Sequence, residues 1–103
     1  MSINISLNQF RLRMQTEQFE LLQKSGSFIE VISENNKDIF FYSVKISNIN
    51  APLIEFFANE IKIYLPTNII SQLNSCNKKE GVEFKNLNSF NIFVQLDIKK
   101  NKF

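Results

Sequence analysis

The chain contains the same strand-to-helix pattern twice, about fifty residues apart, and this duplication limits its possible folds more than any other feature. The first copy is clearest over residues 8–26. There, apolar residues alternate with Arg11 and Arg13 before the spacing changes to that of a helix. A shift of 51 residues superimposes apolar or identical residues at Phe10/Ile61, Leu12/Ile63, Met14/Leu65, Thr16/Thr67 and Phe19/Ile70.

The later part of each copy has the pattern of two further strands. Residues 29–31 align with residues 82–84 at an offset of 53, and residues 40–46 align with residues 92–98 at an offset of 52. We interpret the chain as two pseudo-repeats, about residues 2–47 and 53–98, each a strand-strand-helix-strand-strand unit. The predicted fold is α+β, with about eight mostly antiparallel strands and two short helices in a barrel-like or two-sheet arrangement.

Both predicted helices have recognisable ends. The first covers residues 17–25, with Thr16 as the expected cap and Gly26 as the expected left-handed residue that ends it. In the second copy, Pro66 and Thr67 are suited to the start of a helix. The buried face of that second helix is predicted to consist of Ile69, Ile70 and Leu73.

The strands before each helix are expected to form hairpins. A turn at Asn8-Gln9 would place Leu7, Ile5 and Ile3 opposite Phe10, Leu12 and Met14, all on one face. In the second copy, turns at Ala58-Asn59 and at Asn59-Glu60 both fit. The remaining predicted strands are Ser27–Ser33, Ile39–Ser47, Gly81–Lys85 and Ser89–Ile98.

Composition excludes several kinds of active site. The chain has 103 residues, which predicts a single domain over residues 1–103, and a net charge of +2, too small to indicate nucleic acid by itself. It has no histidine, one cysteine and two glycines. Histidine-based triads, cysteine-rich zinc sites and glycine-rich phosphate loops are therefore excluded. We expect no enzyme activity, no cofactor and no metal, and we interpret Cys76 as an ordinary residue at a helix end.

The same features lead us to expect a cytoplasmic protein. A single cysteine cannot form an intramolecular disulfide, which suits a reducing compartment. The first residues lack the basic and apolar regions of a signal peptide, and no stretch has the pattern of a membrane span.

Basic and aromatic residues that face away from the main apolar rows form the candidate interaction site. It consists of Arg11, Arg13, Phe41, Phe57, Lys62, Tyr64 and Phe93. Such a face suits a protein partner or a homodimer, because aromatic residues and arginine are enriched at interfaces. It also suits single-stranded nucleic acid, with Arg11, Arg13 and Lys62 on phosphates. A small ligand, or an ordinary second layer of buried aromatics beside solvated cations, is the remaining interpretation.

Three stretches resemble a family of short bacterial proteins known only as a domain of unknown function. The first is Leu7–Glu17, which is similar to the family's Gly-Asn-Ser turn, its Ile-Arg-aromatic-Arg-Leu strand and the polar pair before a helix. The others are Leu65-Pro66-Thr67, at a strand-to-helix junction, and the closing stretch Phe93–Ile98. The chain departs from the pattern at Leu7, where the family has glycine, and at Gln95-Leu96, where it has Glu-Lys. It also lacks the family's late cysteine. It therefore resembles a divergent member, and the resemblance implies a fold but no activity.

Overall fold

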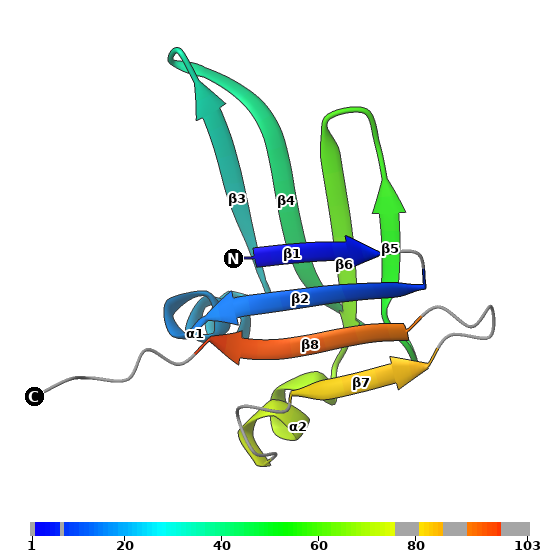
Figure 1. Ribbon diagram of the computed structural model, residues 1–103. Coiled ribbons are helices and arrows are strands. Elements are labelled where there is room, and N and C mark those ends of the chain that lie inside the picture. The colour runs from blue at the N-terminus through cyan, green and yellow to red at the C-terminus, as the bar shows by residue number, and fades with distance from the viewer. Residues whose placement is uncertain (1, 7, 76–80, 86–90, 98–103) are drawn as a thin grey trace, which may run out of the picture. The chain divides into compact units, whose positions relative to one another are not determined.

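The strand-strand-helix-strand-strand pattern occurs twice in the computed structural model, which describes residues 2–6, 8–75, 81–85 and 91–97 (Figure 1). The first copy comprises β1 (Ser2–Ser6), β2 (Gln9–Gln15), α1 (Thr16–Ser25), β3 (Ser27–Glu34) and β4 (Lys37–Ser47). The second comprises β5 (Leu53–Phe56), β6 (Glu60–Pro66), α2 (Ile69–Ser75), β7 (Val82–Lys85) and β8 (Asn91–Asp97). The predicted α+β fold and its internal repeat are confirmed.

The eight described strands form two four-stranded mixed sheets. The first sheet has the order β1-β2-β8-β7, and the second has the order β3-β4-β6-β5. Each hairpin pairs antiparallel, whereas the central pairs β2–β8 and β4–β6 are parallel. The two-sheet alternative is therefore confirmed and the barrel-like alternative is wrong, because both sheets end in edge strands instead of closing.

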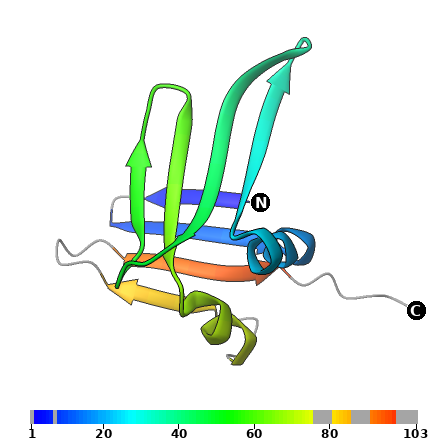
Figure 2. The ribbon, with the colours of Figure 1, turned by 180° about the vertical axis from the view of Figure 1, so that it is seen from behind.

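Each sheet takes one hairpin from each repeat. The first sheet joins β1–β2 of the first copy to β7–β8 of the second, and the second sheet joins β3–β4 to β5–β6. Figure 2 shows the two hairpins of the second sheet from behind. The chain accordingly divides into two compact units that differ from the repeats. Residues 21–67 contain the second sheet, and residues 1–20 with 68–103 contain the first. The expectation of a single domain stays a prediction.

In the first hairpin, the pairing differs from the prediction by two residues. Ile5 pairs with Phe10 and Ile3 with Leu12, while Ser6 pairs with Gln9, so the predicted Asn8-Gln9 turn is wrong. The apolar residues still share one face, because a shift of two residues preserves the alternation of a strand. Leu7, Cys76, Ser89 and Ile98, which other predictions involve, lie outside the described residues.

The second sheet has short turns at the tips of both hairpins. Asn35 and Asn36 have φ angles of 52° and 65°, as a two-residue type I′ turn requires, and they join Glu34 to its partner Lys37. The other hairpin uses Ala58-Asn59, the first of the two predicted turns, since the Phe57 N–H donates to the Glu60 carbonyl.

The pairing also corrects the alignment of the second hairpins in the two repeats. Val44 and Val94 occupy equivalent places beside Ile63 and Leu12, which gives an offset of 50 instead of 52. Phe28 and Val82 pair with these two valines, which gives an offset of 54 instead of 53. A one-residue error matters here, because it assigns Ile29 to the wrong face.

The helix ends follow the sequence signals in part. The Gly26 N–H donates to the Leu22 carbonyl over 3.0 Å with φ at +79°, so Gly26 is the predicted left-handed residue after α1. At the start, Thr16 lies within the helix, not at its cap, and the Gln15 N–H donates to the Gln18 side chain over 2.9 Å.

Each unit has a buried apolar row on one face of its sheet. In the first unit these residues are Phe10, Leu12, Met14, Ile92 and Val94, together with Phe19, Ile69 and Leu73 from the helices. In the second unit they are Phe28, Val44, Ile61, Ile63 and Leu65, together with Leu22 from α1. The predicted buried face of α2 is confirmed for Ile69 and Leu73, while Ile70 is half-buried.

Candidate functional site

The seven predicted site residues lie on two different sheets. Arg11, Arg13 and Phe93 belong to the first sheet. The other four, Phe41, Phe57, Lys62 and Tyr64, are on or directly beside the strands of the second sheet. Because the sheets belong to separate compact units, the structure provides two candidate surfaces and we treat each on its own.

On the first sheet, the structure brings Arg11 and Phe93 together. They are direct partners in the parallel pairing of β2 and β8, and the Arg11 Cζ lies 5.1 Å from the centroid of the Phe93 ring. This is a cation–π contact between two half-buried side chains. The Arg11 Nε is buried and has no hydrogen-bond partner among the described residues. Arg13 is exposed two residues further along β2.

The rest of that face of the first sheet is polar. Asn4 pairs with Arg11, Gln95 pairs with Arg13, and Glu83 pairs with Phe93. The buried apolar row lies on the opposite side of the same strands. Apart from Phe93, this is the composition expected for the solvated side of a sheet.

On the second sheet, the face opposite the buried row combines apolar and charged side chains, and we call it the mixed face. Its members follow from strand alternation and pairing, in three rows that run across β3, β4, β6 and β5. Phe57 follows β5 and continues its alternation. The rows are Val31, Phe41, Glu60 and Phe57; then Ile29, Ser43, Lys62 and Glu55; then Ser27, Lys45, Tyr64 and Leu53.

Four apolar side chains of the mixed face are strongly exposed. Ile29 is 66% exposed, Leu53 and Phe57 are each 51% exposed, and Val31 is 42% exposed, while Phe41 is half-buried. Sequence reasoning missed Ile29, Val31 and Leu53 as site residues. The available signal was the adjacent apolar pairs 28–29, 31–32 and 53–54, because neighbouring strand residues point to opposite faces and one of each pair must face outward.

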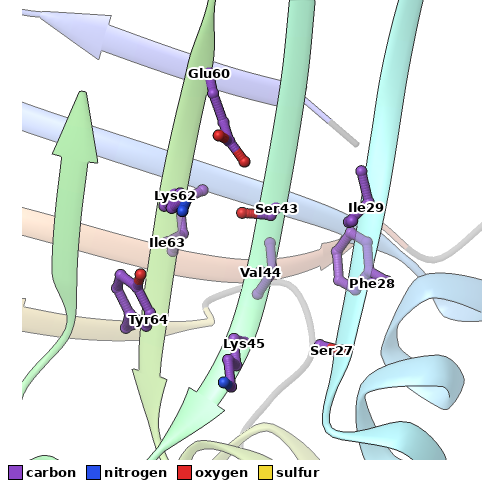
Figure 3. Close-up of a pocket in the computed structure, with 10 residues that line it drawn as sticks. All are labelled: Ser27, Phe28, Ile29, Ser43, Val44, Lys45, Glu60, Lys62, Ile63 and Tyr64. Carbon is purple, nitrogen blue, oxygen red and sulfur yellow. The ribbon is translucent and has the colours of Figure 1, made fainter. Parts of the chain in front are cut away.

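An open groove of about 300 Å³ lies along the centre of the mixed face (Figure 3). Its polar lining comes from three strands and consists of Ser27, Ser43, Lys45, Glu60, Lys62 and Tyr64. The Lys62 Nζ lies 5.4 Å from the centroid of the Phe57 ring, which is a cation–π contact with the residue that follows β5.

Tyr64 and Glu55 are linked across β6 and β5. The Tyr64 hydroxyl is hydrogen-bonded to the Glu55 carboxylate, which stabilises the protonated phenol and raises the pKa of Tyr64 above its ordinary value of 10.0. Burial and the charges of Glu55 and Glu60 raise this pKa further. The mixed face therefore holds its central polar groups in specific contacts, with exposed apolar side chains on both sides.

A comparison with protein-family models matches residues 1–101 to a family described as "Family of unknown function (DUF7009)". The chain belongs to DUF7009. The resemblance inferred from the three sequence stretches is thus confirmed, and the membership of DUF7009 carries no activity with it. No curated protein and no solved structure matches the chain.

Within residues 2–6, 8–75, 81–85 and 91–97, no group of three or more aspartate, glutamate, histidine or cysteine side chains is placed to hold a metal ion. Neither described helix has the length and apolarity needed to cross a membrane.

Proposed function

We propose that the protein acts without catalysis, by binding another protein through the mixed face. The observation that carries this proposal is the exposure of Ile29, Val31, Leu53 and Phe57 on one face of a single sheet. The partner would present apolar side chains together with charges of both signs, because the mixed face offers Lys45 and Lys62 beside Glu55 and Glu60.

The physical support is the cost of leaving such a face in water. An exposed Leu or Phe side chain gains about 1.5–3 kcal/mol when it is fully buried. The mixed face places several such side chains around a charged centre, whereas a solvated sheet face is normally polar. The exposed apolar side chains form two groups, Ile29 with Val31 on β3 and Leu53 with Phe57 on and beside β5, and exposed apolar groups gathered on one face favour an interaction site.

The groove itself is a weaker candidate for an active site. Ser43 is the cross-strand neighbour of Lys62, which is the kind of pair that could activate a serine. The Lys62 amine, however, lies over the Phe57 ring, and the groove opens to solvent instead of excluding water. These features favour binding over chemistry.

The proposal is tested with a photo-crosslinking phenylalanine analogue placed at residue 57, in cells of the source organism. Under ultraviolet light, we expect a covalent adduct whose mass exceeds that of one chain. The matched control places the same analogue at Ser6, which is exposed at the equivalent place of the first sheet and should give no adduct. Absence of any adduct at residue 57, with the protein folded, would contradict the proposal.

One specific observation favours a second candidate function on the other sheet. The Arg11 guanidinium lies over Phe93, and Arg13 is exposed two residues along the same strand, which would allow phosphate contacts beside an aromatic ring. Lys62 lies in the other unit, so this nucleic-acid surface would rely on Arg11 and Arg13 alone.

Fluorescence anisotropy with a labelled single-stranded oligonucleotide tests this second function. Binding should be measurable at about 50 mM salt, weaken strongly at about 200 mM, and weaken further in Arg11→Ala. No binding at the lower salt concentration would rule this function out.

A further inference from the structure

We infer that the partner of the mixed face is a second copy of this chain, packed face to face so that each strand crosses its own counterpart in the reverse direction. This inference rests on the proposed function and names the partner of the same surface. A twofold axis places each row of the mixed face opposite a row of the second copy. The inference follows from which side chains then face one another.

Two twofold arrangements keep the strands of the two copies roughly aligned. If the axis runs along the strands, β3 of one copy faces β5 of the other, which sets Ile29 against Glu55 and Phe41 against Glu60. If the axis runs across the strands, the first row of one copy faces the third row of the other. Only the second arrangement avoids placing carboxylates against apolar side chains.

In this second arrangement, the exposed apolar side chains meet one another. Phe57 of one copy faces Leu53 of the other, and this contact occurs twice in the dimer. Ile29, the most exposed of these apolar residues, lies on the axis and faces its own counterpart. The most exposed apolar groups of the mixed face are therefore removed from water together.

The charges match in the same arrangement. Glu60, in the first row, faces Tyr64 in the third row of the other copy. Lys45 is the cross-strand partner of Tyr64 and therefore lies next to this contact. In the middle row, which lies on the axis, Lys62 and Glu55 each face their own counterpart, and Lys62 of one copy is the diagonal neighbour of Glu55 of the other. The opposite charges that this arrangement brings together are therefore Glu60 and Lys45, once on each side of the axis, and this contact supports the pairing.

Glu60 and Lys45 are not cross-strand partners within one chain. Glu60 is aligned with Phe41, four residues before Lys45 on β4, and the rise along a strand is about 3.3 Å per residue. The backbones of the two residues are therefore about 13 Å apart along the strands, so an ion pair within one chain would need both side chains to lie extended along the sheet. A heterodimer of two charge-reversed variants distinguishes a contact between chains from one within a chain.

The size of the face sets the expected affinity. Its three rows of four comprise about twelve side chains, fewer than the roughly 20–30 residues that each partner contributes to a standard interface. We therefore expect a dissociation constant in the micromolar range, on the order of 1–100 μM. The dimer should be invisible in dilute solution and evident when the protein is concentrated.

The test is sedimentation equilibrium of the full chain, from a few micromolar to several hundred micromolar. Wild-type protein should dimerise, and Lys45→Glu and Glu60→Lys should each weaken the dimer by about tenfold or more. An equal mixture of the two variants should form a heterodimer of nearly wild-type affinity, because each negative pair then faces a positive pair. Arg13→Glu, the same charge change on the first sheet, is the matched control and should leave the dimer unchanged.

Each result decides between the two proposals. A wild-type chain that remains monomeric at every concentration overturns self-association, and a photo-adduct at residue 57 with a different protein would then still support protein binding. A dimer that neither charge reversal weakens would place the contact elsewhere. Circular dichroism checks that each single variant is folded. Formation of the heterodimer requires two folded chains, so the mixture remains informative even if one variant is less stable.

Discussion

The two sheets have the same strand order and the same parallel centre, yet their outward faces differ in character. In each sheet, a hairpin from the first repeat and a hairpin from the second meet along a parallel pair of inner strands. The buried faces are alike, with Phe10, Leu12 and Met14 in one sheet and Ile61, Ile63 and Leu65 in the other. The repeat therefore preserves what the fold buries.

The outward faces differ position by position. Equivalent places in the pairing hold Ser2 and Leu53, Ser6 and Phe57, and Glu83 and Ile29. What both faces keep is a cation over a phenylalanine ring, as Arg11 over Phe93 and Lys62 over Phe57. The duplicated topology therefore constrains the residue types on the buried side of each sheet. The other side is polar in the first sheet, apart from Phe93, and combines apolar and charged residues in the second.

The largest expected effect comes from separating the repeats. A fragment of residues 1–50 contains β1 to β4 but none of their partners β5 to β8, so it leaves two isolated hairpins. Isolated two-stranded hairpins are marginally stable at best. We expect this fragment to be unfolded by circular dichroism and to show no cooperative thermal transition.

The control for this experiment is the complementary fragment of residues 51–103. Mixing or co-expressing the two fragments should restore strand signal, because each sheet needs one hairpin from each. Cooperative unfolding of residues 1–50 alone would show that the sheets do not depend on pairing between the repeats.

The next largest effect distinguishes two glycines that precede edge strands of the two sheets. Both have positive φ, but a Cβ on Gly81 would lie 2.4 Å from the Val94 carbonyl oxygen, whereas a Cβ on Gly26 would have no atom within 4 Å. Gly26→Ala should cost about 1 kcal/mol of unfolding free energy from backbone strain. Gly81→Ala should cost about 2–4 kcal/mol, because crowding against β8 is added.

Urea denaturation of the two alanine variants measures this difference directly. Equal losses of stability would show that β7 can move away from β8 without penalty. A larger loss for Gly26→Ala would contradict the close approach of Gly81 to β8.

Much of this architecture could be predicted from the sequence, because alternation and helix ends are local signals. The repeat, the strand positions and the role of Gly26 all follow from residues that are near one another in the chain. The Asn8-Gln9 turn failed for a physical reason. A two-residue shift keeps Ile3 and Ile5 on the apolar face, so the hydrophobic pattern alone cannot choose between the two registers.

Local signals could not predict that the seven candidate site residues lie on two different sheets. Which hairpins join across the centre of a sheet depends on long-range parallel pairing, and no local signal specifies it. Arg11 and Lys62 occupy equivalent places in the two repeats, so the alignment grouped them, yet pairing places them on different sheets. The exposed Ile29 was missed because both faces of its strand carry apolar residues, so alternation alone does not show which face is buried.

A smaller effect compares the two cation–π contacts. Arg11 and Phe93 are both half-buried, whereas Phe57 is 51% exposed, so water weakens the Lys62 contact more. Double-mutant cycles with alanine should give a coupling of about 0.5–1 kcal/mol for Arg11–Phe93 and a smaller value for Lys62–Phe57. The cycles are measured by urea denaturation at a concentration at which the protein is monomeric. The reverse order of coupling energies would show that burial does not distinguish the two contacts.

The smallest effect concerns Tyr64, whose place in the first sheet is taken by Arg13. The hydrogen bond to Glu55 raises the pKa of Tyr64 above 10.0, so the folded protein holds the phenolic proton more tightly than the unfolded chain does. Its contribution to stability is therefore complete below pH 10 and is lost as the pH rises through the folded-state pKa.

An absorbance titration at alkaline pH in a Tyr42→Phe background follows Tyr64 alone, since the chain has two tyrosines. Glu55→Gln should lower the Tyr64 pKa toward its ordinary value, because it removes the charged acceptor. An unchanged titration in Glu55→Gln would mean that Tyr64 and Glu55 do not interact across β6 and β5.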